Sequence, residues 1–174
     1  MLQVGSKAPD FNLESVMPDG SFKTLSLADY KGKWCVLFFY PLDFTFVCPT
    51  EITSFSHRIA EFAELNATVV GASVDSVHSH QAWINSSLGK IEYPLLSDPT
   101  HVVSREYGVL LEDKGHTLRG TFIIDPDGIV RYHLVHAKSV GRSVDETLRV
   151  LKALQSGDLC PVEWKPGQTT LGKA

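Results

Sequence analysis

The sequence predicts one α/β domain in which a mixed sheet carries helices on both faces. Two short apolar runs rich in aromatic and β-branched residues, Trp34–Tyr40 and Ala67–Asp75, have the composition of buried central strands. An amphipathic pattern separates the two runs, and this β–α–β order makes the strands parallel. At 174 residues, the chain is long enough for one sizeable core and too short for two ordinary domains.

The first helix is predicted from apolar residues that recur at three- and four-residue steps: Ile52, Phe55, Ile59 and Phe62. We interpret this pattern as a single amphipathic helix between the two parallel strands. A second helix is expected around 79–86, followed by a short strand within Tyr93–Asp98.

The second half of the chain predicts a hairpin and a final helix. Pro-Asp-Gly joins two β-rich runs within 120–135, which is a hairpin signal. Ser143 and Glu146 have the spacing of a capping box, and Gly157 is expected to end the helix that follows. We therefore expect an α/β domain over 1–156 and an extended, Pro- and Gly-rich C-terminal tail over 157–174.

Charge and composition exclude several classes of function. The net charge is −4 and the pI is about 5.9, whereas nucleic acid and anionic membranes are bound through a basic surface. The N-terminal residues lack the layout of a signal peptide, and no apolar run approaches the ~20 residues that span a bilayer. The expected location is the cytosol, with neither nucleic acid nor membrane as a partner.

The chain has three cysteines, Cys35, Cys48 and Cys160. An odd number without C-x-x-C spacing favours thiols in a reducing compartment over a disulfide scaffold, a zinc site or a thioredoxin-type dithiol. Cys35 lies inside a predicted buried strand, where a packing role is expected. The seven histidines do not form a pattern that indicates a metal site, so no metal is expected.

Cys48 lies between the predicted strand Trp34–Tyr40 and the predicted helix that follows it, and Pro49 comes directly after Cys48. Proline favours the first helical position, so the sulfur of Cys48 is expected at the N-terminal end of the helix. The unpaired N–H groups and the positive end of the helix dipole favour a nucleophilic thiolate there. From the residues alone, a reactive thiol and a small buried side chain both remain open for Cys48.

Several residues have the chemistry to support a reactive Cys48. Thr45 offers a hydroxyl three residues earlier, and Pro41 constrains the connection from the strand. Arg119, at the start of a predicted strand, is the first candidate to supply positive charge, and Arg142 is the next. Glu51 lies in the first turn of the helix and would disfavour a nearby thiolate, so we expect an arginine paired with it.

The stretch "PLDFTFVCPTE" contains the pattern Pro-x-x-x-Thr-x-x-Cys, which resembles the active-site motif of peroxiredoxins. The chain is similar to the typical two-cysteine group of that family, close to the peroxidase subunit of bacterial alkyl hydroperoxide reductase. The resemblance extends over nearly the whole chain, in the expected order, through "APDF", "YPLLSDPT", "LRGTFIIDPDG", "GRSVDETLR" and "CPVEWKPG".

The resemblance implies a thioredoxin-like fold and thiol-dependent reduction of hydrogen peroxide and organic hydroperoxides. It implies that Cys48 is the peroxidatic cysteine, in a pocket formed with Pro41, Thr45 and Arg119. Cys160 matches the resolving cysteine, which in this family comes from the partner subunit and closes a disulfide with the oxidised sulfur. A dithiol protein or a flavoprotein is then the expected reductant. Homodimers that assemble into a ring are the expected oligomer, without a metal or bound cofactor.

The chain departs from the oxidation-sensitive members of the family in two places. Ser86-Ser-Leu-Gly89 aligns with their Gly-Gly-Leu-Gly stretch, and the sequence ends without their Tyr-Phe extension. We therefore expect fast disulfide formation and resistance to over-oxidation to the sulfinic acid. Two other functions stay open at this point: a holdase chaperone or redox relay, and a cysteine hydrolase, for which no adjacent histidine base is apparent.

Overall fold

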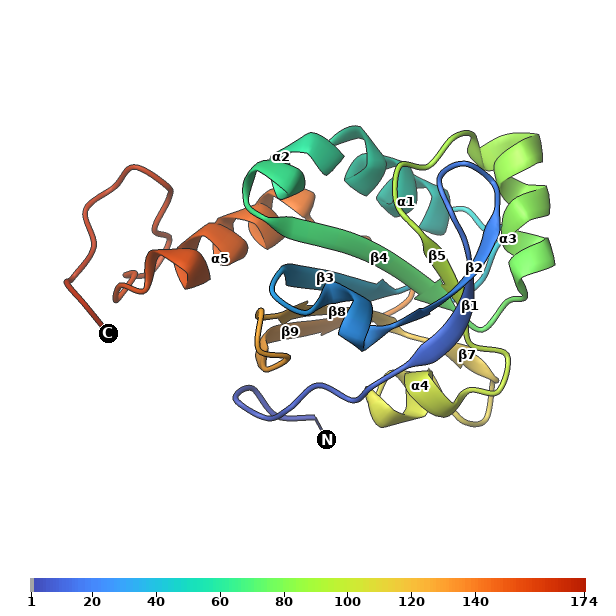
Figure 1. The fold of residues 1–174 in the computed structure, drawn as a ribbon, viewed down its shortest axis with the longest axis horizontal. Helices are drawn as coiled ribbons and strands as arrows, with labels where there is room; N and C mark the ends of the chain where they lie inside the picture. The colour runs from blue at the N-terminus through green and yellow to red at the C-terminus, as the bar shows by residue number, and fades with distance from the viewer. Residues whose placement is uncertain (1) are drawn as a thin grey trace. The chain divides into compact units, whose positions relative to one another are not determined.

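The computed structural model describes residues 2–174, which form two compact units, one that ends at Arg142 and one that spans Ser143–Ala174. A seven-stranded mixed sheet with the order β2-β1-β5-β4-β3-β8-β9 makes up the centre of the first unit (Figure 1). The parallel pairs are β3–β4 and β4–β5, and the remaining neighbours are antiparallel. The strands are β1 (Asn12–Val16), β2 (Phe22–Ser26), β3 (Trp34–Phe39), β4 (Ala67–Ser73), β5 (Leu95–Ser97), β8 (Arg119–Ile124) and β9 (Val130–His136).

Helices lie on both sides of this sheet. The helices α1 and α2 run above it in Figure 1, and α4 lies below. A small second sheet pairs β6 (Leu110–Leu111) with β7 (His116–Thr117). The first unit contains the helical segments η1 (Leu27–Tyr30), α1 (Cys48–His57), α2 (Ile59–Glu64), α3 (Val77–Trp83), η2 (Ile84–Leu88) and α4 (Val102–Glu106).

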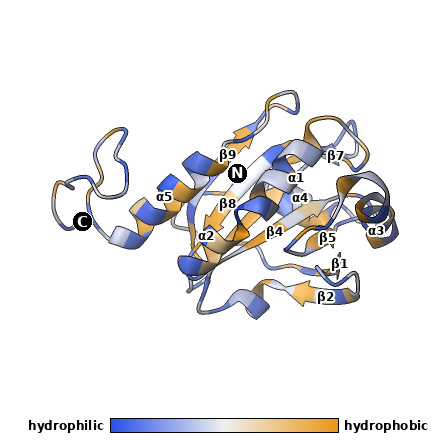
Figure 2. Ribbon diagram, turned by 90° about the horizontal axis from the view of Figure 1, so that it is seen from above, coloured by the Kyte–Doolittle hydropathy of each residue, from blue (hydrophilic) through white to orange (hydrophobic). Residues whose placement is uncertain are grey.

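Strand β3 separates two apolar layers, because its successive side chains point to opposite faces of the sheet. Cys35, Leu37 and Phe39 belong to the core cluster that also contains Val103 of α4. Phe38 points the other way and stacks on Phe55 of α1, with ring centroids 4.7 Å apart. Strand β4 is largely orange in the hydropathy view (Figure 2), and β8 is orange toward its C-terminal end, as expected for strands that are covered on both faces.

The strands and the hairpin expected from the sequence are present. The runs Trp34–Tyr40 and Ala67–Asp75 become β3 and β4, which pair in parallel, and the Pro-Asp-Gly hairpin becomes β8 and β9. The β1–β2 hairpin, α4 and the small β6–β7 sheet were not expected from the sequence. Their segments are short, and short segments give weak periodicity.

The prediction of one continuous helix through Ile52 and Phe62 is wrong in one respect. The helix breaks at Arg58, whose φ of −108° and ψ of 14° leave the helical region. The Arg58 N–H bonds to the carbonyl of Phe55, three residues back, at 3.3 Å, so the turn tightens, and α2 begins at Ile59. The apolar pattern continues across this break, so the periodicity does not indicate it.

The second unit contains helix α5 (Val144–Ser156) and the segment after it. Ser143 caps α5 by accepting a hydrogen bond from the Glu146 N–H at 3.1 Å, and Gly157 ends the helix at a φ of 64°. Glu146 pairs with Arg149 through its side chain rather than completing the capping box. The tail contains no helix or strand, but it folds back so that Asp158 bridges to Lys173. It is therefore a closed loop and not a fully extended chain.

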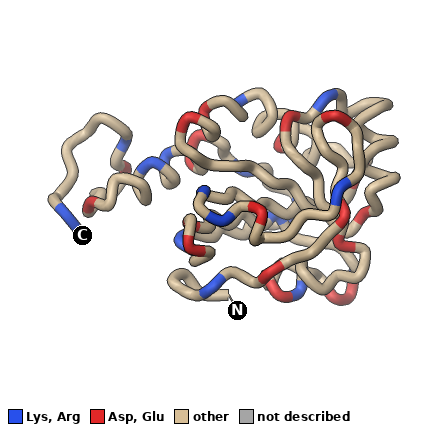
Figure 3. Tube along the Cα trace, in the orientation of Figure 1, with Lys and Arg blue, Asp and Glu red and all other residues tan. Residues whose placement is uncertain are grey.

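Acidic and basic side chains are interspersed along the chain (Figure 3). The most exposed large apolar side chain in the first unit is Phe46, at 95%. No helix within residues 2–174 combines the length and the apolar character needed to cross a bilayer.

Candidate active site

Cys48 is the first residue of α1, and Pro49 is the second. The expected placement at the strand-to-helix junction is therefore confirmed, with the helix starting one residue before the proline. Strand β3 ends at Phe39, and the connecting segment 40–47 leads to this cysteine. Cys48 is fully buried, so its sulfur lies inside the protein and not on its surface.

Arg119 reaches the Cys48 sulfur from the first position of β8. Its Nη1 lies 3.4 Å from Sγ of Cys48 and donates a hydrogen bond of 2.6 Å to Oε2 of Glu51. Its Nε donates to the carbonyl of Lys138 at 2.8 Å, which fixes the plane of the guanidinium. Arg119 is 3% exposed, so its charge acts on the sulfur with little screening by solvent.

An arginine was expected to pair with Glu51, and two arginines do so, Arg119 and Arg142. Arg142 donates to Glu51 Oε1 from both its backbone N–H and its Nε, each at 2.8 Å, and to Oε2 from Nη2 at 2.8 Å. Its Nη1 donates to the carbonyls of Phe39 and Gly120, also at 2.8 Å. Arg142 therefore ties the end of β3, the start of β8 and helix α1 together.

These buried charges favour an anion at the sulfur. Two guanidiniums and one carboxylate leave one uncompensated positive charge (2 − 1 = +1) beside Cys48. Burial pushes the pKa of Glu51 up, but the hydrogen bonds and charge of Arg142 and the charge of Arg119 hold it below its ordinary value. Glu51 therefore stays ionised, neutralises one arginine, and leaves the other free to stabilise negative charge on sulfur.

Pro41 and Thr45 lie in the segment that leads to Cys48. Pro41 is buried, and the Thr45 hydroxyl donates to the carbonyl of Leu42 at 3.0 Å. This bond orients the hydroxyl and leaves its lone pairs available as acceptors. Phe44 in the same segment has a φ of 53°, which is unusual for an aromatic residue. Tertiary contacts therefore impose the conformation of this segment.

A buried polar network around Asp43 also holds the segment 40–47 in place. Asp43 accepts hydrogen bonds from the Tyr40 hydroxyl at 2.9 Å and the Ser79 hydroxyl at 2.8 Å. Its Oδ2 lies 2.8 Å from Nδ1 of His80, and its N–H donates to Asp75 at 2.8 Å. Sequence reasoning missed this network, because its members are up to 40 residues apart and share no local pattern.

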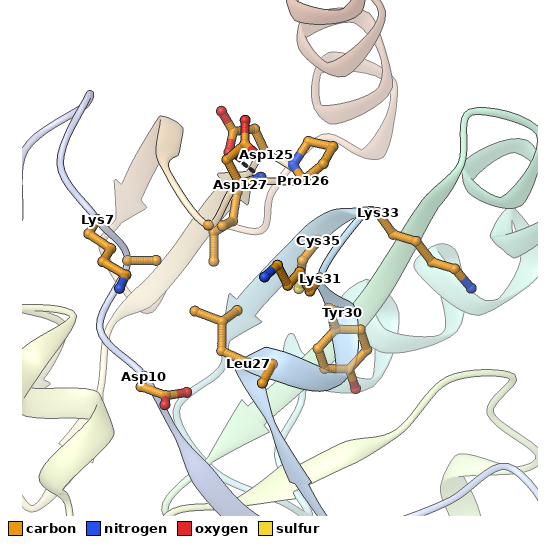
Figure 4. A pocket seen from close by; sticks show the side chains of 14 residues that line it. Lys7, Asp10, Leu27, Tyr30, Lys31, Lys33, Cys35, Asp125, Pro126 and Asp127 are labelled. Carbon is orange, nitrogen blue, oxygen red and sulfur yellow. Dashed lines mark hydrogen bonds between the residues drawn. The ribbon is translucent and has the colours of Figure 1, made fainter.

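Cys35 lies in a different part of the first unit, at the start of β3. It lines a cavity of about 270 Å³ together with Tyr30 and Leu27, with Lys7 and Asp10 also on the lining (Figure 4). Burial raises the pKa of the Cys35 thiol to about 12, so it stays protonated and unreactive. The expected packing role of Cys35 agrees with its exposure of 1%.

Cys160 belongs to the second unit and is half-buried. Its sulfur lies 3.6 Å from the Ser156 hydroxyl and 4.0 Å from the carbonyl of Ala153, both on the last turns of α5. Cys35, Cys48 and Cys160 are all free thiols. Within residues 2–174, no three His, Cys, Asp or Glu side chains are grouped so as to hold a metal ion.

Comparison with known proteins identifies the family. The AhpC/TSA family matches residues 4–133. A protein of Clostridium pasteurianum, named as a candidate peroxiredoxin in the rubredoxin operon, is 56% identical over 97% of this chain and 98% of its own length. Peroxiredoxin-1 of Gallus gallus is 52% identical over 97% of this chain and 89% of its own length.

The chain belongs to the AhpC/TSA family of peroxiredoxins. It is therefore a thiol-dependent peroxidase. The reduced 2-Cys peroxiredoxin of Plasmodium vivax superposes with a TM-score of 0.94 at 42% identity, over 96% of this chain and 91% of its own. Mycobacterium tuberculosis AhpC gives a TM-score of 0.86 at 40% identity, over 95% and 99% of the two chains. The fold expected from the sequence is confirmed by these matches. In this peroxiredoxin, Cys48, Glu51, Arg119 and Arg142 form one connected cluster.

Proposed function

We propose that this peroxiredoxin reduces hydrogen peroxide and organic hydroperoxides with Cys48 as the attacking sulfur, in the cytosol. The observation that carries this assignment is the 3.4 Å contact between Arg119 Nη1 and Cys48 Sγ. Of the three cysteines, Cys48 is the one whose sulfur is paired with a buried guanidinium within the described residues. Cys35 stays protonated, because burial raises its thiol pKa to about 12.

In the first step, the Cys48 thiolate attacks the nearer oxygen of the peroxide. An S–O bond forms while the O–O bond breaks, which gives a sulfenic acid on Cys48 and an alkoxide or hydroxide that takes up a proton. Negative charge moves from sulfur to the leaving oxygen during this step. Arg119 is placed to stabilise it, with Pro41 and Thr45 shaping the site where the peroxide is aligned.

Access to the sulfur requires movement. Cys48 is fully buried, and we infer that a shift of the segment 40–47 admits the peroxide. The exposed rings of Phe44 and Phe46 show that this segment lies at the surface of the first unit.

In the second step, the Cys160 thiol of a partner subunit attacks the sulfenic sulfur of Cys48. A disulfide forms, and the hydroxyl leaves as water with the proton of the thiol. A dithiol protein or a flavoprotein then returns the disulfide to two thiols by exchange. In this assignment, residues 1–156 are the peroxidase domain and residues 157–174 carry the resolving cysteine, within a dimer that assembles into a ring.

Non-reducing electrophoresis tests the pairing. One equivalent of hydrogen peroxide is expected to convert the wild-type chain to a band at twice the monomer mass. The variant Cys160→Ser still consumes the first equivalent but stays monomeric on the gel, because its sulfenic acid has no thiol to close on. A dimer band of equal intensity in Cys160→Ser would contradict the resolving role of Cys160.

A further inference from the structure

The loop that carries Cys160 is closed at its base by an ion pair. Asp158 and Lys173 bridge the two ends of the loop, with Lys173 Nζ 2.7 Å from Asp158 Oδ1. Asp158 Oδ2 accepts a hydrogen bond from the Thr170 hydroxyl at 3.0 Å. Backbone hydrogen bonds join the same two ends, from Leu159 N–H to the Gly172 carbonyl at 2.8 Å and from Leu171 N–H to the Leu159 carbonyl at 2.9 Å.

The carboxylate of Asp158 depends on Lys173. Its Oδ1 is shielded from solvent, and Lys173 Nζ lies 2.7 Å from it. Hydrogen bonding and charge from Lys173, together with the Thr170 hydroxyl, hold the pKa of Asp158 below its ordinary value. Lys173 Nζ also lies 3.4 Å from the carbonyl of Ser156 at the end of α5. Lys173 thus connects the loop base to the helix.

The closed loop points the Cys160 sulfur at its own helix. Ser156 contacts the sulfur and also accepts a hydrogen bond from the Asp158 N–H at 3.2 Å. Cys160 is only two residues from Asp158, so it cannot leave α5 without disturbing the loop base. In the resting chain the Cys160 sulfur therefore lies against α5.

We propose that the Asp158–Lys173 ion pair is a latch that holds Cys160 in its resting place and limits the rate at which it attacks the oxidised Cys48 of a partner subunit. The inference rests on the resolving role proposed for Cys160. Attack requires the loop to open, so any change that weakens the latch raises the population of the open, reactive state. Asp158 and Lys173 are positioning residues, and neither takes part in bond formation.

The test compares disulfide formation in Lys173→Ala and wild type after one equivalent of hydrogen peroxide. Samples are quenched with an alkylating agent at successive times and separated without reductant. Lys173→Ala is expected to form the intersubunit disulfide about 2- to 5-fold faster, the range of an exposed ion pair. Mass spectrometry at excess peroxide should show correspondingly less Cys48 sulfinic acid, because faster closure competes with over-oxidation.

Two matched variants separate a latch from a general loss of structure. The charge swap Asp158→Lys with Lys173→Asp restores an opposite-charge pair and is expected to return the rate to that of wild type. Lys165→Ala removes another exposed lysine from the same loop and should leave the rate unchanged. Raising the ionic strength should accelerate the wild type and not Lys173→Ala, because salt screens only a pair that exists.

An unchanged or slower rate in Lys173→Ala, or a charge swap that stays fast, would overturn the latch. This result is distinct from failure of the proposed function, in which the wild-type chain forms no disulfide between Cys48 and Cys160.

Discussion

Substitution of Cys48 by serine is expected to abolish peroxide consumption. A serine hydroxyl is not ionised beside Arg119, and oxygen does not form the sulfenic acid on which turnover depends. The expected loss is roughly 10³-fold or more, the scale on which enzymes lose rate when the nucleophile is removed. The measurement is hydrogen peroxide loss with a dithiol reductant in excess.

Cys35→Ala is the matched control for this experiment. Cys35 is buried, and burial raises its thiol pKa to about 12, so its removal is expected to leave peroxide consumption at the wild-type level. Circular dichroism of both variants checks that the fold is kept. Continued turnover by Cys48→Ser would place the chemistry at another residue.

Substitution of Glu51 by glutamine is expected to destabilise the protein strongly. Glu51 is 3% exposed and faces two guanidiniums that are themselves buried. Without its charge, Arg119 and Arg142 repel one another in a site of low dielectric. Removal of one partner from a buried charge cluster costs about 3–5 kcal/mol. Urea unfolding measures this loss as a lower free energy of unfolding, and the m-value is expected to stay unchanged.

The exposed pair Arg105–Glu112 provides a control for Glu51. Both side chains are more than half exposed, so Glu112→Gln should shift the urea midpoint little. An equal shift of the urea midpoint in the two variants would mean that the buried cluster contributes no more to the free energy of unfolding than an exposed ion pair does.

The stability contributed by Glu51 also depends on pH in a definite direction. Its folded pKa lies below the ordinary value of 4.5, so its contribution is complete above pH 4.5 and is lost as the pH falls through the folded pKa. The free energy of unfolding of wild type should therefore fall with acidification in this range more steeply than that of Glu51→Gln.

The sequence predicted the parts of the fold and site that depend on local pattern. The strand Trp34–Tyr40 is a continuous apolar run, and Pro49 places Cys48 at a helix start by its own stereochemistry. The need for an arginine at Glu51 followed from charge alone, since a carboxylate beside a thiolate is unfavourable. All three are confirmed by the structure.

Other features depend on contacts between distant residues. His80 reaches Asp43 across 37 positions, and Arg142 reaches the carbonyl of Phe39 across 103. The break at Arg58 interrupts a regular apolar pattern, and the closure of the tail by Asp158 and Lys173 joins two short polar segments. No periodicity marks such positions, because they are fixed by packing.

The identity of the sulfur that reacts with peroxide is the central claim, and trapping of the sulfenic acid tests it most directly. The Cys160→Ser variant is treated with one equivalent of hydrogen peroxide in the presence of dimedone, digested, and mapped by mass spectrometry. The expected result is a single dimedone adduct on Cys48, with Cys35 unmodified. An adduct on Cys35, or peroxide consumption without any adduct on Cys48, would contradict the account.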